Sequence, residues 1–465
     1  MSTINSDDVA MIDELGRDKF AAQLVNSLMS SFDAVNESIV VGVSGSWGSG
    51  KSTLLSFIKN HLDIAYKSNS DSYQVITFNS WANTGIEEIE RSLLESIIQA
   101  LDKIKWKEPL EEANNSFKKY LKYLNYLKVI KHVHPVAKSI LEAVDEYVKQ
   151  VPVHSITEIK EQADKLIKEK GIKLYVLVDD LDRLSPEEIT NLFKVIKLNI
   201  NIINTFFIIA YDKEVVIDAL RHQYGKNGEK YLEKIIQTEF LIPQLLNEQI
   251  EQIFFKNLKG IFSKFTIEYD EGKFFSIWNH YGLREYFKNI RDTKRYFNNL
   301  LFSLPNIGTE ININDFISLE AIKTFDYKAY ERIYDEVTIT TRKAIWTSTS
   351  FDEATISQFE NATTQSLLRY LFINEGANSR KSLNDKRLRD PEFFQRYFAL
   401  SISSTDITEE NLKHFFTVGS DKNRLLKETL QSERMENFLR RLMDSDLNQY
   451  YKVNDEQLFY NFLQF

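Results

Sequence analysis

The chain has 465 residues, of which 43% are hydrophobic and 27% charged, as in a folded protein of about three domains. It contains no cysteine, which excludes disulfides, thiolate metal sites and cysteine nucleophiles. Its 58 Lys and Arg residues against 67 Asp and Glu residues give a net charge of −9, which excludes a polybasic nucleic-acid coat but not a local basic groove.

The start of the chain lacks the basic and apolar regions of a secretory signal, and no apolar run approaches the ~18 residues of a membrane helix. We therefore expect a cytoplasmic protein without a transmembrane segment. Glycine is scarce, at 15 residues, yet four glycines fall within residues 42–50. Glycine is used where backbone must bend or approach a ligand, so this stretch is the candidate active region.

Residues 38–43 are short, apolar and β-branched, which predicts a buried strand. A complete G-x-x-x-x-G-K-[ST] motif follows at residues 45–52, and apolar residues then recur at helical spacing. In this setting backbone N–H groups surround a phosphate, Lys51 reaches the β- and γ-phosphates, and the Ser52 hydroxyl binds Mg²⁺. A glycine-rich turn that binds nothing is the weaker interpretation. The residues expected to contact nucleotide are Gly45, Ser46, Trp47, Gly48, Ser49, Gly50, Lys51, Ser52 and Thr53.

Two further strands are expected at residues 73–78 and 173–178. The first precedes Trp81, which we interpret as a packing residue. The second ends in Asp179-Asp-Leu-Asp-Arg183, and parallel strands place such ends at one crevice. We assign Asp179 to the metal and Asp180 to orienting or deprotonating the attacking water. The alternative is a solvated acidic turn before the next helix.

Residues 205–210 predict another strand, which we expect to lie between the phosphate-loop strand and the acidic strand. Asp212 follows its tip. Two interpretations of Asp212 stay open: a polar group near the γ-phosphate, or the N-cap of the helix expected at residues 213–221.

Taken together, these pieces resemble the KAP P-loop NTPases, within the broader STAND-like ATPases. The resemblance covers roughly residues 8–300. Its motifs lie in order at residues 13–17, 20–24, 45–52, 78–81, 179–183, 210–216, 234–240 and 290–295. The tryptophan inside the phosphate loop and the Asp-Asp-Leu-Asp-Arg run are its most specific parts.

The resemblance implies ATP hydrolysis with Mg²⁺, used as a conformational switch or assembly cycle, and at family level a role in phage defence. It also implies that Arg17 lies near the adenine. Arg291 or Arg295 is implied to act as a sensor arginine; a solvated basic helix face is the alternative. One departure concerns residues 103–170, where many members carry two transmembrane helices. Here lysines interrupt both apolar stripes, so we expect a helical insertion, with a membrane-surface helix as the alternative.

The predicted fold class is α/β: a parallel P-loop sheet with helices on both faces, a helical insertion, a helical lid and a mainly α C-terminal domain. The expected domains are residues 1–245, with the insertion at about 103–170, a lid at 246–310 carrying the sensor-like arginines, and residues 311–465. A basic cluster at residues 380–389 is interpreted either as a solvated loop or as a phosphate contact.

The leading hypothesis is a regulatory ATPase that reports its nucleotide state through the C-terminal helices to protein partners or to sister subunits of a homo-oligomer. A phosphotransferase, a nucleic-acid motor and a nucleotide-gated scaffold without hydrolysis are the alternatives. The acidic balance and the lack of repeated helicase-like cores argue against the motor.

Overall fold

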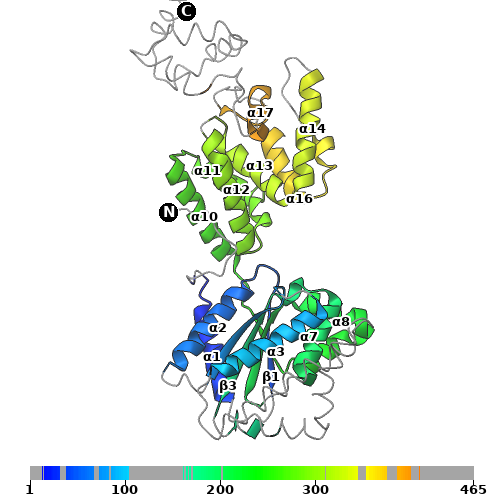
Figure 1. The fold of residues 1–465 in the computed structure, drawn as a ribbon. Coiled ribbons are helices and arrows are strands. Elements are labelled where there is room, and N and C mark those ends of the chain that lie inside the picture. Colours follow the sequence, from blue (N-terminus) through cyan, green and yellow to red (C-terminus); the bar gives the residue numbers. More distant parts are fainter. Residues whose placement is uncertain are drawn as a thin grey trace, which may run out of the picture. The chain divides into compact units, whose positions relative to one another are not determined.

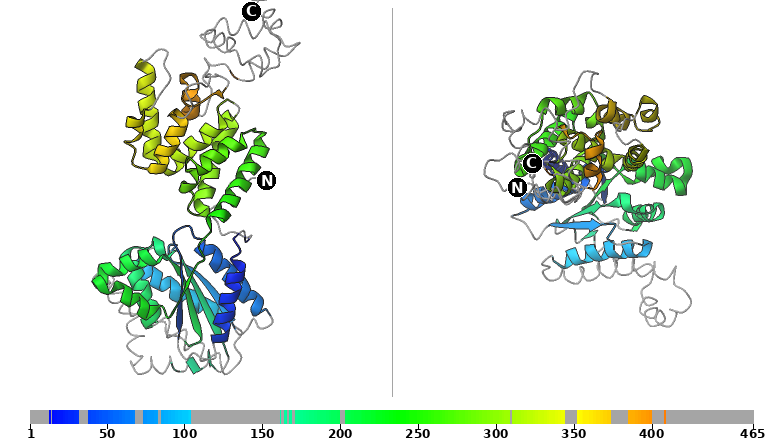
Figure 2. Two further views of the ribbon diagram at one scale, coloured as in Figure 1. Left: turned by 180° about the vertical axis from the view of Figure 1, so that it is seen from behind. Right: turned by 90° about the horizontal axis from the view of Figure 1, so that it is seen from above.

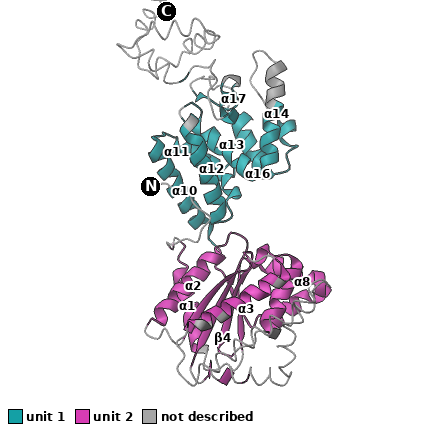
Figure 3. Cartoon of the chain, viewed as in Figure 1, with its two compact units in different colours: residues 1–7, 245–465 teal, residues 8–244 magenta. Residues whose placement is uncertain are grey.

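The structure is a computed structural model (Figure 1). It describes residues 13, 15–31, 38–67, 73–82, 85–103, 161, 164–165, 167–168, 171–199, 203–308, 310–343, 352–373, 385–399 and 408. The chain forms two compact units: residues 8–244, and residues 1–7 together with 245–465 (Figure 3). The predicted insertion at residues 103–170 lies, apart from a few positions at its ends, outside the described residues.

The first unit is built on a parallel sheet. Among the described residues it has five strands, in the order β2-β3-β4-β1-β5. The strands are β1 (Ile39–Ser44), β2 (Tyr73–Asn79), β3 (Lys173–Asp179), β4 (Thr205–Tyr211) and β5 (Thr238–Leu241). The prediction that a further strand separates the phosphate-loop strand from the acidic strand is confirmed, because β4 pairs with both β1 and β3. The short edge strand β5 was not expected, since its mostly exposed residues give no alternating pattern.

Alternation along the strands explains why helices cover both faces of this sheet (Figure 2). In β4, Phe207 and Ile209 belong to one buried cluster, whereas Phe206 and Ile208 belong to another. One cluster is completed by α1 (Asp18–Ser31) and α2 (Lys51–Ala65). The other is completed mainly by α3 (Ile86–Asp102), α7 (Pro186–Lys194), α8 (Lys213–Tyr224) and α9 (Gly228–Ile235). The predicted α/β fold class is therefore confirmed.

Because the strands are parallel, their carboxyl ends meet at one edge of the sheet. The register places Asn79 of β2 opposite Asp179 of β3, and Ser44 of β1 opposite Tyr211 of β4. The loops that follow these four residues therefore start side by side.

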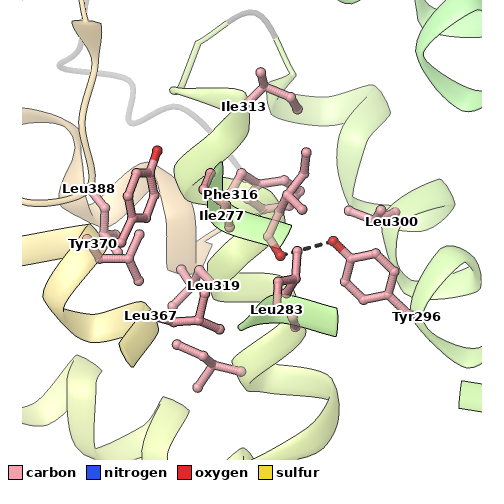
Figure 4. Packing of buried hydrophobic residues seen from close by; sticks show 14 of the residues in the cluster. Ile277, Leu283, Tyr296, Leu300, Ile313, Phe316, Leu319, Leu367, Tyr370 and Leu388 are labelled. Atoms are coloured by element: carbon pink, nitrogen blue, oxygen red, sulfur yellow. Dashed lines mark hydrogen bonds between the residues drawn. The ribbon is translucent and has the colours of Figure 1, made fainter. Parts of the chain in front are cut away.

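The second unit is helical in its described residues and packs around one hydrophobic cluster (Figure 4). Tyr296 lies wholly inside it and donates a hydrogen bond to the Ile317 carbonyl oxygen at 3.0 Å. The helices are α10 (Asn247–Phe265), α11 (Glu271–Asn279), α12 (Ile290–Ile307), α13 (Ile313–Phe325), α14 (Tyr327–Lys343), α15 (Glu353–Ile356), α16 (Ala362–Leu368) and α17 (Pro391–Ala399). Helices from the predicted lid and from the predicted C-terminal domain contribute to this same cluster.

The basic cluster at residues 380–389 falls partly outside the described residues, and its described members are neither a solvated loop nor a free phosphate site. Lys386, Arg387 and Arg389 are buried. The Nε of Arg387 lies 2.8 Å from Asp315 Oδ2, which also accepts a hydrogen bond from the Leu388 backbone. Arg387 is therefore paired with the carboxylate of Asp315 on α13.

In the part of the chain that the structure describes, no helix combines the length and the apolarity needed to span a bilayer.

The buried Arg387–Asp315 pair predicts a large stability effect. Arg387→Ala leaves the wholly buried carboxylate of Asp315 without its cation, which should lower the free energy of unfolding of this unit by about 3 kcal/mol. Urea unfolding followed by the fluorescence of the buried Trp278 measures the change. The control is Arg369→Ala, whose pair with Glu353 is solvent-exposed and should contribute less than about 1 kcal/mol. Equal losses in the two variants would contradict this prediction.

Candidate functional site

The loop between β1 and α2 has the backbone of a phosphate cradle. Gly48 and Gly50 have φ values of 79° and 86°, in the left-handed region that side chains disfavour. A Cβ atom at Gly45 would meet Ser49 Oγ at 2.6 Å. The loop is fastened to the neighbouring strand by a 3.1 Å hydrogen bond from the Gly45 backbone N–H to the Tyr211 carbonyl oxygen. The N-terminus of α2 then points its first N–H groups at this loop, which favours an anion there.

Lys51 opens α2 and turns its ammonium group back over the loop. Its Nζ atom lies 3.0 Å from the Gly45 carbonyl oxygen, 3.3 Å from that of Ser46, and 2.7 Å from Asp182 Oδ2. The ion pair is sheltered, with 11% of the Lys51 side chain and 5% of the Asp182 side chain exposed. The cation is therefore held in the cradle by oxygen atoms that an incoming phosphate could replace.

Asp182 is a site residue to which sequence reasoning gave no role. Its second carboxylate oxygen accepts a hydrogen bond from the Asp212 backbone N–H at 2.5 Å, so it joins the ends of β3 and β4 to the lysine of the loop. The only signal in the sequence is the third acid of the run at residues 179–182.

Ser52 and Asp179 are brought together as the sequence predicted. The Ser52 hydroxyl donates a hydrogen bond to the Asp179 carboxylate, which also accepts one from the Asp180 backbone at 2.8 Å. Burial raises the pKa of Asp179, and the hydrogen bond from Ser52 counteracts part of that rise. The two side chains supply a hydroxyl and a carboxylate, both ligands that suit Mg²⁺.

The donor set fits a metal that is shared with phosphates rather than a closed protein cage. No group of three or more His, Asp or Glu residues in the described ranges could hold a metal by itself. Mg²⁺ typically takes one or two protein oxygens and fills its octahedron with substrate phosphates and water. The Ser52–Asp179 pair next to the loop matches that requirement.

Asp180 is held by side chains on either side of it. Its Oδ2 accepts a hydrogen bond from Asn79 Nδ2 at 2.8 Å, and its Oδ1 lies 3.0 Å from Arg183 Nε. Its φ of 57° is in the left-handed region, which is uncommon for a residue other than glycine. Such backbone strain is frequently found at functional positions.

Asp212 caps a helix, as one of its two interpretations proposed. Its side chain accepts a hydrogen bond from the Glu214 backbone N–H at 3.1 Å at the start of α8. The alternative, a contact with the γ-phosphate, stays a prediction.

Arg17 is buried under the phosphate loop. Its guanidinium donates to the carbonyl oxygens of Ser49 and, at 3.4 Å, of Pro243, and burial lowers the pKa of this arginine. A Cβ atom at Gly50 would collide with it. Arg17 thus braces the loop, while its predicted place near the adenine stays a prediction.

Arg291 and Arg295 belong to the second unit, on α12, with Arg295 exposed. Their assignment as sensor arginines stays a prediction.

Comparisons with known proteins point to one family. The sequence model of the KAP family P-loop domain matches residues 17–305. The phage T7 exclusion protein of Escherichia coli strain K12 is 22% identical over 363 residues, which cover 72% of this chain and 47% of that protein. The chain thus spans about half the length of this curated relative.

Solved structures give weaker likenesses. The ADP form of the Aeropyrum pernix ORC2 protein is 12% identical, with a TM-score of 0.36 over 78% of this chain and 87% of that one. The ORC1 protein of the same organism in complex with DNA is 10% identical, with a TM-score of 0.36 over 91% and 84%.

The burial of the Asp179 carboxylate predicts that, without nucleotide, this residue lowers the free energy of unfolding. Burial raises the pKa of Asp179 in the folded protein above its value in the unfolded chain. At neutral pH the ionised carboxylate therefore lowers the free energy of unfolding, and this loss disappears in acid, where the carboxyl group is protonated in both states. Asp179→Asn should therefore raise the Tm without nucleotide at pH 7 by about 2 °C, and the gain should shrink as the pH falls towards 4.

Thermal unfolding across pH measures this effect. The matched control is Asp218→Asn, an exposed carboxylate on α8 that should shift the Tm by less than about 1 °C. A lower Tm for Asp179→Asn at pH 7 would show that the contacts with Ser52 and Lys51 outweigh the burial.

Proposed function

The chain belongs to the KAP family of P-loop domain proteins, and we propose that it binds ATP with Mg²⁺ between β1 and α2 and hydrolyses the triphosphate. The observation that carries the proposal is the meeting of Lys51 and Ser52 with Asp179 and Asp180 at one edge of the sheet. Residues more than 120 positions apart in the sequence are joined there by the Ser52–Asp179 hydrogen bond.

Binding rests on charge and on backbone geometry. In our proposal the phosphates take the place of the Gly45 and Ser46 carbonyl oxygens around Lys51, whose charge offsets that of the triphosphate. Ser52 and Asp179 would hold a bound Mg²⁺, which supplies further charge neutralisation at the phosphates.

Hydrolysis requires a group that orients water. Asp180 is the candidate, since it follows Asp179 at the strand end and 18% of its side chain remains exposed. We assign the attacking water to the Asp180 carboxylate, which orients it and accepts its proton. The hydrogen bond from Asn79 fixes the direction of this carboxylate.

The helices of the second unit are our candidates for sensing whether nucleotide is bound. We propose that the nucleotide state is read out by the helices of residues 245–399 as a conformational switch or an assembly signal. Protein partners or further copies of this chain would bind through residues 311–465.

We extend the proposal to exclusion of phage. The support is the name of the relative, the phage T7 exclusion protein of Escherichia coli, which is 22% identical over 363 residues that cover 47% of that protein.

Two substitutions test the hydrolysis proposal. Lys51→Ala should abolish ATP binding, because the loop loses its cation, whereas Asp180→Asn should bind ATP and lose about 100-fold or more in kcat. Equilibrium dialysis with labelled ATP measures binding, and phosphate release measures turnover. Lys59→Ala, on the same helix, is the matched lysine control and should behave as wild type. Wild-type protein that binds no ATP, or Asp180→Asn protein with normal turnover, would contradict the proposal.

Phage plating tests the biological role. Expression of the wild-type chain in an Escherichia coli host should reduce plaque formation by phage T7, and Lys51→Ala should restore it because the site can no longer bind nucleotide. Equal plaque numbers with and without the wild-type chain would count against a defence role while leaving the ATPase proposal untouched.

A further inference from the structure

Two half-exposed tryptophans flank the candidate site from different loops. Trp47 lies inside the phosphate loop and is 47% exposed, and Trp81 follows β2 and is 50% exposed. Single exposed aromatic side chains are common on protein surfaces, so the informative feature here is the neighbour that these two tryptophans share.

One guanidinium lies over both rings. The central carbon of the Arg183 guanidinium is 4.8 Å from the ring centroid of Trp81 and 5.7 Å from that of Trp47. Both distances are within the range of cation–π attraction. Arg183 therefore connects the loop after β3 to the phosphate loop and to the loop after β2.

The same side chain pairs with the proposed catalytic carboxylate. Arg183 Nε lies 3.0 Å from Asp180 Oδ1, and its backbone N–H donates to the Asp180 carbonyl oxygen at 3.2 Å. The other carboxylate oxygen is bonded to Asn79, whose own side-chain oxygen accepts hydrogen bonds from the backbone of Trp81 at 3.0 Å and of Ala82 at 3.1 Å. Both partners of Asp180 are thus tied to the loop that carries Trp81.

A solvated ion pair is the simplest alternative, and the chain provides an example for comparison. Arg221 and Asp218 on α8 are also three positions apart in the sequence, and Arg221 Nη1 lies 2.8 Å from Asp218 Oδ1. Their side chains, however, are 55% and 70% exposed. Those of Arg183 and Asp180 are 31% and 18% exposed. The Arg183 pair is the more sheltered of the two, and it also holds a residue with a left-handed backbone.

We propose that Arg183 is a positioning residue for Asp180, and that its contact with Trp47 links the direction of that carboxylate to the occupancy of the phosphate loop. This inference rests on the proposed ATP hydrolysis. Phosphates entering the loop change the surroundings of Trp47, and the guanidinium that lies over Trp47 carries the change to Asp180.

Turnover of Arg183 variants is the first test. Arg183→Ala should lower kcat by about 10-fold to 100-fold, because a carboxylate displaced by about 1 Å loses its hold on the reacting water. ATP binding should stay within about threefold of wild type, since Arg183 is not among the groups assigned to the phosphates. Arg183→Lys should recover part of the rate, keeping the charge but not the planar stacking. Arg221→Ala is the matched control and should leave both constants unchanged.

A double-mutant cycle separates positioning from general structural support. In an Asp180→Asn background the carboxylate is gone, so adding Arg183→Ala should change the residual turnover by less than about twofold. An equal loss in both backgrounds, or a normal kcat for Arg183→Ala, would overturn the inference. If Arg183→Ala does not fold, the turnover of Arg183→Lys is measured in the wild-type and Asp180→Asn backgrounds instead, and the same two outcomes apply.

Fluorescence tests the link to the loop. A non-hydrolysable ATP analogue should change the tryptophan emission of the wild-type protein, Trp47→Phe should remove most of that change, and Arg183→Ala should reduce it while analogue still binds by equilibrium dialysis. Bound analogue without any change in emission would overturn the link between Trp47 and Asp180. Absence of binding to the wild-type protein would instead overturn the proposed function.

Discussion

The ion pair between Lys51 and Asp182 organises the site, because it joins three strand ends through two side chains. Lys51 follows β1, Asp182 follows β3, and Asp182 also binds the backbone at the end of β4. An ammonium group held 2.7 Å from a carboxylate, with little of either side chain in water, has few other arrangements available to it. Lys51 is thereby held over the phosphate loop, at the edge of the sheet where the strands end.

Buried ion pairs also join segments of the second unit. There Arg396 is paired with Glu310 at 3.0 Å and Arg387 with Asp315 at 2.8 Å, and all four side chains are buried. Each pair joins the segment around α17 to the segment around α13. Buried charges are costly alone, so such pairs restrict which surfaces of the helices can meet.

The sheet and the ends of its strands could be predicted because their signals are local. Runs of β-branched and apolar residues mark each central strand, and the glycines and acids that follow them mark the edge where a ligand would lie. Even the position of β4 between β1 and β3 followed from the chain order and the motifs. The short strand β5 was missed because an edge strand with exposed residues lacks this pattern.

The remaining features depend on partners far away in the sequence. The sequence assigns Asp182 no role, and the fold pairs it with Lys51. The basic cluster around Arg387 has two interpretations from the sequence, a solvated loop or a phosphate contact, and the fold instead pairs Arg387 with Asp315. The sequence predicts that Trp81 is a packing residue; in the structure it is half exposed and lies against Arg183. Nothing within a few residues of these positions encodes such contacts. Asp212 is the opposite case, since its cap is local and one of its two interpretations already included it.

The end of the first unit is connected by hydrogen bonds to the phosphate loop and to the strand before it. Just before the second unit begins at Leu245, the Ile242 backbone N–H is bonded at 2.9 Å to the Ser44 carbonyl oxygen, and the Pro243 carbonyl oxygen accepts from Arg17, which also holds Ser49. The segment that leads into the second unit is therefore hydrogen-bonded to the residue just before the phosphate loop and, through Arg17, connected to Ser49 within it. A displacement of residues 242 and 243 would therefore act on the phosphate loop through these hydrogen bonds.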